Sequence, residues 1–433
     1  MARKIIILGG GISGLSTAWH LKKVHGSEVD VTILERTKRL GGWIQTHRQE
    51  GYLFELGPRS CRASGSGLST LQLVEQLGLQ SEILVPSSHA KKRYIYTKGA
   101  LRKVPTNPLS FLISPLTRPL IWPLLREWRV PASRVEDESI HDFVERRLGA
   151  HAARVLIDPL ISGIYAGDTR KLSVKSCLPF LHEWEIKQGS ILGGLFKQSP
   201  AVYSSAFVKS IAKAGLFTFR RGMQQLVDTL GIRVDAEILT DCTVTKVEGQ
   251  TVYTTRGVFE GDEIISAVPS HSLATILNDP ALNEIPFTSV AVVCFGYSQS
   301  VLPLNGFGYL IPSSEAEKLL GVVWDSSAFP QHNQQKDETR LTCMIGGEHM
   351  KNFANNSVED FIEIAKEGLR RHLSIYAEPD VTTVKLANHA IPQYTLGHAQ
   401  RVSELQAKLS IKLTGSSYHG VSVNDCITTG KSG

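Results

Sequence analysis

Residues 4–15 read KIIILGGGISGL, and this stretch decides the fold. The apolar, largely β-branched run 4–8 predicts a buried strand. The glycines that follow open a helical pattern in which Leu15, Ala18 and Trp19 fall on neighbouring turns. A second apolar run at 29–34 predicts another strand. The resulting βαβ unit has the size expected for dinucleotide binding, so the expected fold class is α/β with a Rossmann-like cofactor domain.

The loop between the first strand and the helix fits the pattern G-x-G-x-x-G. Gly9 permits a tight turn, Gly11 lets the backbone approach a pyrophosphate, and Gly14 lets the helix pack on the strand. The N-terminus of the helix then faces the phosphates. Glu35 ends the second strand, where its carboxylate can accept hydrogen bonds from both ribose hydroxyls and disfavours a 2′-phosphate. The pattern therefore predicts an adenine dinucleotide other than NADP.

Composition narrows the class of protein. The chain has 433 residues, 42% of them apolar, which is enough for a large core and two or three domains. Subtracting 41 acidic from 47 basic residues gives a net charge of +6, and the cations are scattered, so nucleic acid is not an expected partner. The six cysteines contain no C-x-x-C pair, which predicts neither a zinc site nor a disulfide framework and favours a reducing compartment.

The segment 105–131 contains six prolines and therefore predicts short helical pieces rather than one long helix. It belongs to a stretch, from about 90 to 200, that we predict to be mainly helical. Two interpretations stay open: an interfacial segment that enters lipid headgroups, or a buried helical subdomain. The side chains that suggest lipid contact are Phe111, Leu112, Ile113, Leu116, Leu120, Ile121, Trp122, Leu124, Leu125 and Trp128, interleaved with Arg118, Arg126 and Arg129.

After Gly215 the pattern changes from helical to strand-rich. A helix is predicted at 223–230, and a meander follows from strands at 233–247, 251–255 and 263–268. Further strands at 289–297, 308–311, 320–324 and 340–345 predict a largely antiparallel sheet. Ser357 with Asp360 then forms a capping pair for another helix, and a strand, a helix and a strand close the chain.

Further motifs carry a family resemblance. The strand-end Glu35 followed by RLGG (39–42) resembles the motif of glutathione-reductase-type flavoproteins of the amine oxidase superfamily. Within that superfamily, six stretches in order are similar to the protoporphyrinogen oxidase family of heme synthesis, and the resemblance runs from residue 5 to about 430. These stretches are LGGWI (40–44), FELGPR (54–59), GIYAGD (163–168), GFGYLIP (306–312), IPQYTLGH (391–398) and GSSYHGVSVNDCI (415–427).

The resemblance implies a cofactor and a domain plan. The cofactor would be non-covalently bound FAD rather than NAD, and no metal is expected. A discontinuous FAD-binding domain (1–66, 214–270 and 398–433) would accompany a substrate domain with a mixed or antiparallel sheet (67–89 and 271–397). Residues 90–213 would form a mainly helical, membrane-associated domain. The FAD contacts implied are Gly9, Gly10, Gly11, Ile12, Ser13, Gly14, Glu35, Arg36, Gly41, Gly42, Trp43, Gly57, Pro58, Arg59, Ser60, Val244, Ser416, Val421, Ser422 and Val423.

The implied reaction is a six-electron oxidation of protoporphyrinogen IX to protoporphyrin IX, with dioxygen as acceptor and hydrogen peroxide as by-product. Arg93 would pair with a propionate, which suits its guanidinium fork. The backbone oxygen of Gly163 would accept a pyrrole N–H, and Leu310, Phe329 and Met344 would form apolar walls. No catalytic residue of the chain itself is expected, because the flavin carries the chemistry.

Alternatives and partners also follow from the resemblance. Coproporphyrinogen III oxidation stays open, because that family differs in how many propionates the pocket must neutralise, and so does a non-catalytic flavin-binding protein. Amine oxidation is disfavoured, because Val292 stands where amine oxidases typically have a lysine and Cys426 is not placed for covalent flavin attachment.

We expect the protein to lie in the cytoplasm, in peripheral contact with the inner membrane. A location at a mitochondrial inner membrane is also compatible with the sequence. A homodimer and a neighbouring heme-pathway enzyme are further expected partners.

Overall fold

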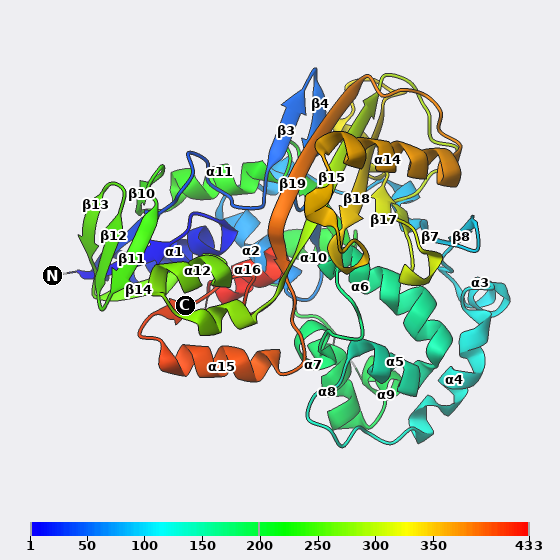
Figure 1. Cartoon of the computed structure of the whole chain (residues 1–433), viewed down its shortest axis with the longest axis horizontal. Helices are drawn as coiled ribbons and strands as arrows, with labels where there is room; N and C mark the ends of the chain where they lie inside the picture. Colours follow the sequence, from blue (N-terminus) through cyan, green and yellow to red (C-terminus); the bar gives the residue numbers. More distant parts are fainter. Residues whose placement is uncertain (1, 198–199, 432–433) are drawn as a thin grey trace.

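The computed structural model describes residues 2–197 and 200–431 and contains two large sheets and a helical part (Figure 1). The first sheet is parallel and begins with β1 (Arg3–Leu8), α1 (Ile12–His25) and β2 (Val29–Leu34), which confirms the predicted βαβ unit. β1 also pairs in parallel with β14 (Glu263–Ser266). The spatial order of the five strands is β10 (Glu237–Leu239), β2, β1, β14 and β20 (Lys412–Leu413).

Alternation along β1 explains why both faces of this sheet are covered. Ile5 and Ile7 point into one core, and Ile6 and Leu8 into another, as successive strand residues must. On the first face lie α1, α2 (Gly67–Gln76), α11 (Gln224–Arg233) and α16 (Val423–Thr429). On the second lie α12 (Ser270–Leu277), α15 (His398–Lys408) and a meander of β11 (Val244–Glu248), β12 (Thr251–Thr254) and β13 (Gly257–Glu260).

The second sheet has seven strands and is mostly antiparallel, as predicted. Helix α14 (Val358–Leu373), capped by Ser357 and Asp360 as expected, packs on one of its faces (Figure 1). The opposite face is turned toward the rest of the molecule. In spatial order the strands are β19 (Val381–Pro392), β15 (Phe287–Tyr297), β18 (Thr339–Gly346), β17 (Leu319–Val323), β16 (Gly308–Leu310), β7 (Arg93–Thr97) and β8 (Ala100–Lys103).

The stretch from about 90 to 200 is mainly helical, as predicted, but it begins with strands β7 and β8, because β7 completes the second sheet through parallel pairing with β16. One prediction about the strands is wrong. The predicted strand at 233–247 divides into β10 and β11, which belong to different sheets. Asp241, with φ of 54°, turns the chain between them, and short-range periodicity does not show such a turn.

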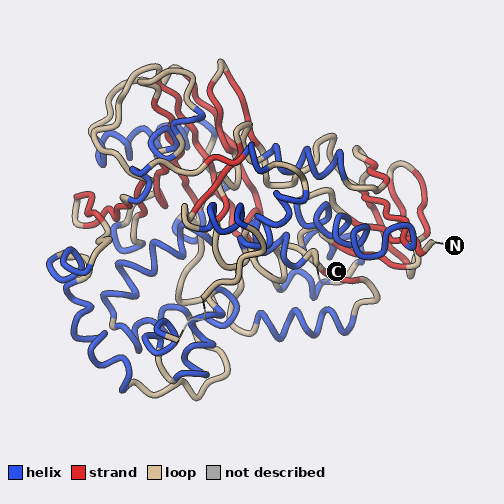
Figure 2. The backbone as a smooth tube through the Cα atoms, turned by 180° about the vertical axis from the view of Figure 1, so that it is seen from behind, coloured by secondary structure: helices blue, strands red, loops and turns tan. Residues whose placement is uncertain are grey.

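The prolines between 105 and 131 limit the helices to short pieces, as predicted. Helices α3 (Pro108–Ile113) and α4 (Ile121–Arg126) are each six residues long. Figure 2 shows this part from behind as a group of short helices beside the strand-rich regions. No helix within 2–197 or 200–431 is both long enough and apolar enough to cross a membrane. The further helices are α5 (Ile140–Leu148), α6 (Asp158–Tyr165), α7 (Val174–Cys177), α8 (Pro179–Gln188), α9 (Ile191–Phe196) and α10 (Ala206–Ala212).

A buried ion-pair network joins these short helices. Arg147 of α5 lies 2.7 Å from Glu127 and 2.5 Å from Glu185 of α8, and all three side chains are fully buried. Glu127 also accepts hydrogen bonds from Ser190 Oγ and the Ile191 backbone N–H at the start of α9. Burial alone would raise the pKa of Glu127, but these hydrogen bonds outweigh it and hold the pKa below its ordinary value. One arginine thus fixes three separate segments.

We predict that Arg147→Met lowers the free energy of unfolding by about 3 kcal/mol or more, because it leaves the buried Glu127 carboxylate without a counter-charge and leaves Glu185 paired with Arg146 alone. Urea unfolding followed by circular dichroism measures the loss. The matched control is Lys187→Met, which breaks an exposed pair with Glu183 and should cost less than about 0.5 kcal/mol. Equal losses in the two variants would contradict a structural role for the network.

Candidate flavin and substrate site

The glycine loop places the N-terminus of α1 directly against the end of β1. Gly9 has φ of 101°, which L side chains rarely adopt, and a Cβ on Gly14 would lie 2.0 Å from the Gly9 carbonyl oxygen. Among the described residues no side chain caps α1 at Gly11, and its first turn contains no acidic residue. The first N–H groups of the helix therefore lack a side-chain acceptor, which suits a bound pyrophosphate.

Glu35 is held beside this loop at the end of β2. Its Oε2 accepts a hydrogen bond from the Gly10 N–H at 2.8 Å, and its Oε1 accepts one from the Thr37 N–H at 2.8 Å. The Glu35 carbonyl accepts the Cys242 N–H at 2.9 Å, which brings the segment before Val244 to the same edge. The predicted nucleotide residues Glu35 and Val244 thus come together, while Arg36 is exposed on the surface beside them.

The second glycine pair faces the first. Gly11 and Gly41 form a parallel bridge, and a Cβ on Gly42 would lie 3.4 Å from the Gly11 Cα. The motif 57–60 follows strand β4 (Tyr52–Glu55), which pairs with β3 (Thr46–Gln49). A Cβ on Gly57 would lie 1.9 Å from the Trp43 carbonyl oxygen, so the motifs 41–43 and 57–60 lie against each other. Trp43 itself is 39% exposed.

The C-terminal motif reaches the same loop from the other side. A Cβ on Gly415 would lie 3.2 Å from Ser13 Oγ, and α16, capped by Ser422 and Asp425, packs on α1 through Val423. Tyr394 fixes the loop between them, because its hydroxyl donates to the Ser416 carbonyl and accepts the Gly420 N–H. The sequence motif IPQYTLGH contains Tyr394, but no role was predicted for it.

The predicted substrate residues gather on the inner face of the second sheet. Leu310 of β16 pairs with Gly321 of β17, which pairs with Met344 of β18. Met344 in turn pairs with Val292 of β15. Paired residues in a sheet point to the same face, so Leu310, Met344 and Val292 form one apolar row. Helix α6 lies over this row, since a Cβ on Gly163 would lie 2.8 Å from Leu310 Cδ2.

Arg93 points to the same face of the sheet. Its neighbours Tyr94 and Tyr96 enter the core under α14, so Arg93 and Ile95 must face the other way. The Arg93 guanidinium carbon lies 5.3 Å from the centre of the Phe307 ring, and Phe307 packs in a small cluster with Phe329. The structure therefore brings Arg93 and Phe329 together at one end of the sheet and Gly163, Leu310 and Met344 together at its middle.

Asp325 and Thr342, which the sequence did not single out, connect the predicted cofactor residue Arg59 to the second sheet. Arg59 Nε lies 3.8 Å from Asp325 Oδ1, and Asp325 Oδ2 accepts a hydrogen bond from Thr342 at 2.7 Å. Thr342 lies two residues before Met344 on the same face. The neighbouring Glu55 is buried, and burial raises its pKa to about 8 despite hydrogen bonds from the Met223 N–H and Thr46. Asp325 could not be foreseen, because no sequence pattern surrounds it.

These features fit FAD. The glycines leave the backbone open where a pyrophosphate would lie, and the Glu35 carboxylate lies beside them, where it could accept hydrogen bonds from ribose hydroxyls. The segments 41–43, 57–60 and 415–423 gather around the same loop. The candidate cofactor and substrate residues therefore occupy adjoining parts of one site.

Comparison with known proteins agrees with a flavin site. A family model described as flavin containing amine oxidoreductase matches residues 12–433. The chain belongs to this family, which confirms the predicted superfamily and FAD as its cofactor. Among solved structures, a protein of Exiguobacterium sp. 255-15 has a TM-score of 0.83 at 23% identity, covering 100% of this chain and 98% of that one. At this identity the likeness shows the fold alone.

Relatives that match over nearly their full length include porphyrinogen oxidases. The chain is 36% identical over 465 residues to protoporphyrinogen oxidase of Homo sapiens, covering 100% of this chain and 97% of the relative. It is 30% identical over 465 residues to coproporphyrinogen III oxidase of Bacillus subtilis, covering 99% of this chain and 96% of the relative. These relatives confirm the resemblance to the protoporphyrinogen oxidase family.

We predict that Gly14→Ala abolishes FAD binding, because the new methyl group would force α1 away from Gly9. The measurement is flavin absorbance of the purified protein and titration of the apoprotein with FAD. Gly193→Ala is the matched control, since a Cβ on this other helical glycine has no neighbour closer than 3.5 Å. Full flavin content in Gly14→Ala would show that the loop does not hold the cofactor.

Proposed function

We propose that the protein catalyses the FAD-dependent six-electron oxidation of protoporphyrinogen IX to protoporphyrin IX, with dioxygen as the acceptor. The observation that carries this proposal is the apolar row Leu310–Met344–Val292, which lies beside the flavin motifs and has Arg93 on the same face. A largely apolar macrocycle with a carboxylate edge matches such a surface. The 36% identity to a protoporphyrinogen oxidase over the full length supports it.

Each substrate residue has a proposed role. The Arg93 guanidinium binds a propionate through paired hydrogen bonds. The Gly163 carbonyl oxygen accepts a pyrrole N–H, and Leu310, Phe329 and Met344 pack on the ring and exclude water. FAD held by the predicted cofactor residues would supply hydride acceptance and electron transfer to dioxygen, each dioxygen leaving as hydrogen peroxide. The cation left by hydride loss is delocalised onto pyrrole nitrogen, so no strong base of the chain is needed.

We propose the domain plan outlined by the sequence with three changes. Residues 93–103 go with the substrate part, since β7 and β8 are strands of its sheet. Helix α2, which the sequence assigned to the substrate part, goes with the FAD part, because it packs in the core of the first sheet. The remaining helical residues up to 213 form the third part, except for α10, which packs in the same core and also goes with the FAD part. The site lies where the three parts meet.

The purified, flavin-loaded protein in air should convert protoporphyrinogen IX into a fluorescent porphyrin faster than coproporphyrinogen III, with hydrogen peroxide formed alongside. Porphyrin fluorescence and a peroxide assay measure the two products against blanks for spontaneous oxidation. Porphyrin without peroxide would exclude dioxygen as the direct acceptor. Absence of turnover with both substrates would favour a non-catalytic flavin protein.

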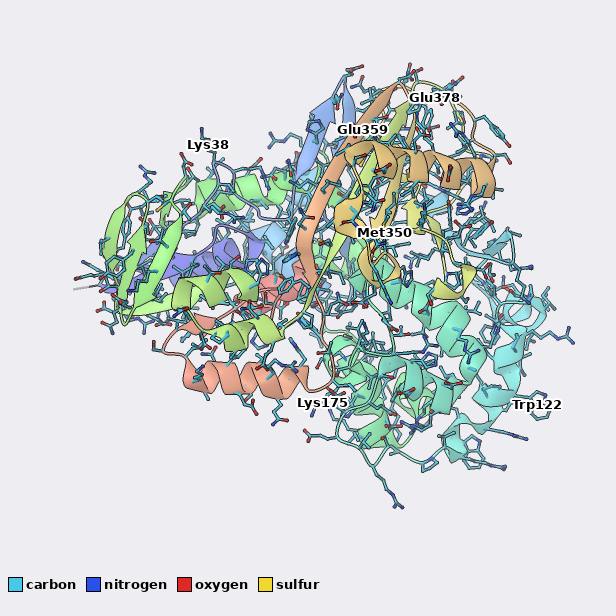
Figure 3. All side chains as sticks on the ribbon, viewed as in Figure 1. Lys38, Trp122, Lys175, Met350, Glu359 and Glu378 are labelled. Carbon is cyan, nitrogen blue, oxygen red and sulfur yellow. The ribbon has the colours of Figure 1, made fainter. Side chains whose placement is uncertain are left out.

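We further propose peripheral membrane contact through α3, α4 and their connections, on the cytoplasmic face of an inner membrane. Trp122 is 70% exposed and projects outward at the edge of the molecule (Figure 3), and Leu109, Ile113, Leu125 and Trp128 are also exposed. Between residues 83 and 135 the chain has ten Lys and Arg, and its one acidic residue, Glu127, is buried. This combination suits an anionic lipid surface.

Fewer residues of the segment 105–131 are exposed for lipid contact than the sequence predicted. Leu116 and Leu120 were among the residues expected to meet lipid, but they are 1% and 6% exposed and belong to the core of the helical part. Leu124 is partly buried against the same core. A one-dimensional pattern cannot separate the two sides of helices this short.

Replacing Trp122, Leu125 and Trp128 together by Ser should release the protein from vesicles that contain anionic lipids, because the aromatic and aliphatic surface of these side chains would no longer be buried in the lipid. Vesicle sedimentation measures the bound fraction, and flavin absorbance checks the fold. Tyr376→Ser is the control, since Tyr376 is 73% exposed but lies in the sheet-containing part. Unchanged sedimentation of the triple variant would contradict membrane contact at this surface.

A further inference from the structure

Arg340 is a buried arginine that none of the roles described above uses. It belongs to β18, four residues before Met344, so its side chain lies on the same inner face of the second sheet. The residue is 2% exposed. An arginine this deeply buried needs hydrogen-bond partners for its N–H groups, because each unpaired one would cost free energy. The partners therefore show what this side chain holds together.

The partners of Arg340 lie in two segments that are far apart in the sequence. Nη1 donates to the Leu53 carbonyl oxygen of β4 at 3.0 Å, while Nη2 donates to the Phe329 carbonyl oxygen at 3.2 Å and to Asn333 Oδ1 at 2.7 Å. Nε donates to Glu338 Oε1 at 2.8 Å, and Glu338 is buried as well. One guanidinium group thus joins β18 to β4 and to the turn that carries Phe329.

The charge of Arg340 is balanced inside the protein. Burial lowers the pKa of its guanidinium group, and the carboxylates of Asp325 and Glu338 oppose this effect. A lysine here would keep the ion pair with Glu338, but its ammonium group presents all its donors at one point and cannot span the separate acceptors. The arrangement therefore needs the fork of an arginine and not its charge alone.

Phe329 is placed by short, irregular segments. It follows the four-residue helix α13 (Asp325–Ala328) directly and precedes a single 3₁₀ turn. Its ring packs with Phe307, over which the Arg93 guanidinium lies. Helices of one turn have few hydrogen bonds of their own to fix a side chain. The bond from Arg340 therefore fixes the backbone that carries the apolar wall beside Arg93.

The other end of this connection lies on the flavin side. Strand β4 leads directly into the motif 57–60. Two aromatic residues of β4, Tyr52 and Phe54, pack on the inner face of the second sheet. The hairpin of β3 and β4 thus has an apolar attachment of its own. Loss of Arg340 would consequently free Phe329 more than β4.

We propose that Arg340 is a positioning residue, which holds Phe329 at a fixed place relative to the flavin motif 57–60 so that the ring packs on the porphyrinogen. This role rests on the proposed porphyrinogen oxidation. Arg340 acts through Phe329 and touches no reacting atom. Its loss therefore weakens substrate binding and leaves the reaction of reduced flavin with dioxygen unchanged, since no substrate takes part in that step.

The test follows flavin reduction by protoporphyrinogen IX without dioxygen, at increasing porphyrinogen concentration. In Arg340→Lys the concentration that gives the half-maximal rate should rise about tenfold. Reoxidation of dithionite-reduced flavin by dioxygen should stay within about twofold of the wild type. Arg147→Lys is the matched control, because this arginine is also fully buried and ion-paired but lies in the helical part. Both of its values should stay within about twofold.

A double-mutant cycle separates positioning from a structural role. Phe329→Ala should also raise the half-maximal concentration, and adding Arg340→Lys to it should change the value by no more than about twofold, because the ring that Arg340 places is gone. Additive effects, or a wild-type value for Arg340→Lys, refute the positioning role and leave the proposed function standing. If protoporphyrinogen IX does not reduce the wild-type flavin, the proposed function and this role are both refuted.

A milder variant serves if Arg340→Lys lacks flavin. Asn333→Ala removes one of the two acceptors of Arg340 Nη2 and leaves the buried ion pair intact. The half-maximal concentration should rise about threefold, and this rise should disappear in the Phe329→Ala background. A rise that persists there, or no rise at all, refutes the positioning role.

Discussion

The contact between Gly14 and the Gly9 carbonyl is the constraint on which the flavin site depends. It lets α1 begin directly at the end of β1, so the free N–H groups of the helix and the Glu35 carboxylate face the same space. The second glycine pair and the C-terminal loop are then placed by packing on Gly11 and Ser13. Segments separated by about 400 residues in the sequence thus meet around one helix end.

The stability of the helical part depends on a different interaction. Short helices broken by proline contribute few hydrogen bonds of their own, and exposed tryptophans remove apolar surface from the core. The buried network around Arg147 compensates, because it joins α5, α8 and the start of α9 through charge-assisted hydrogen bonds. The helices that carry these exposed apolar side chains are therefore joined by a buried ion-pair network as well as by an apolar core.

Local patterns predicted much of this architecture. The βαβ unit, the Ser357 cap and the strands from 289 to 345 follow from periodicity and capping, which act over a few residues. The sequence could not show that β7 joins the second sheet, since its partner β16 lies more than 200 residues away. It also could not show the contact of Arg59 with Asp325 or the burial of Leu120, because both depend on tertiary packing.

Tyr394 connects regions that otherwise have separate cores. Its hydroxyl holds the backbone at Ser416 and Gly420, while its carbonyl oxygen accepts the Ser173 N–H at the start of α7. Its ring stacks on His398, at 4.0 Å between ring centres, so the tyrosine has little freedom to rotate. A displacement of α7 would consequently shift the backbone at Ser416 and Gly420, which lies next to the candidate flavin motifs.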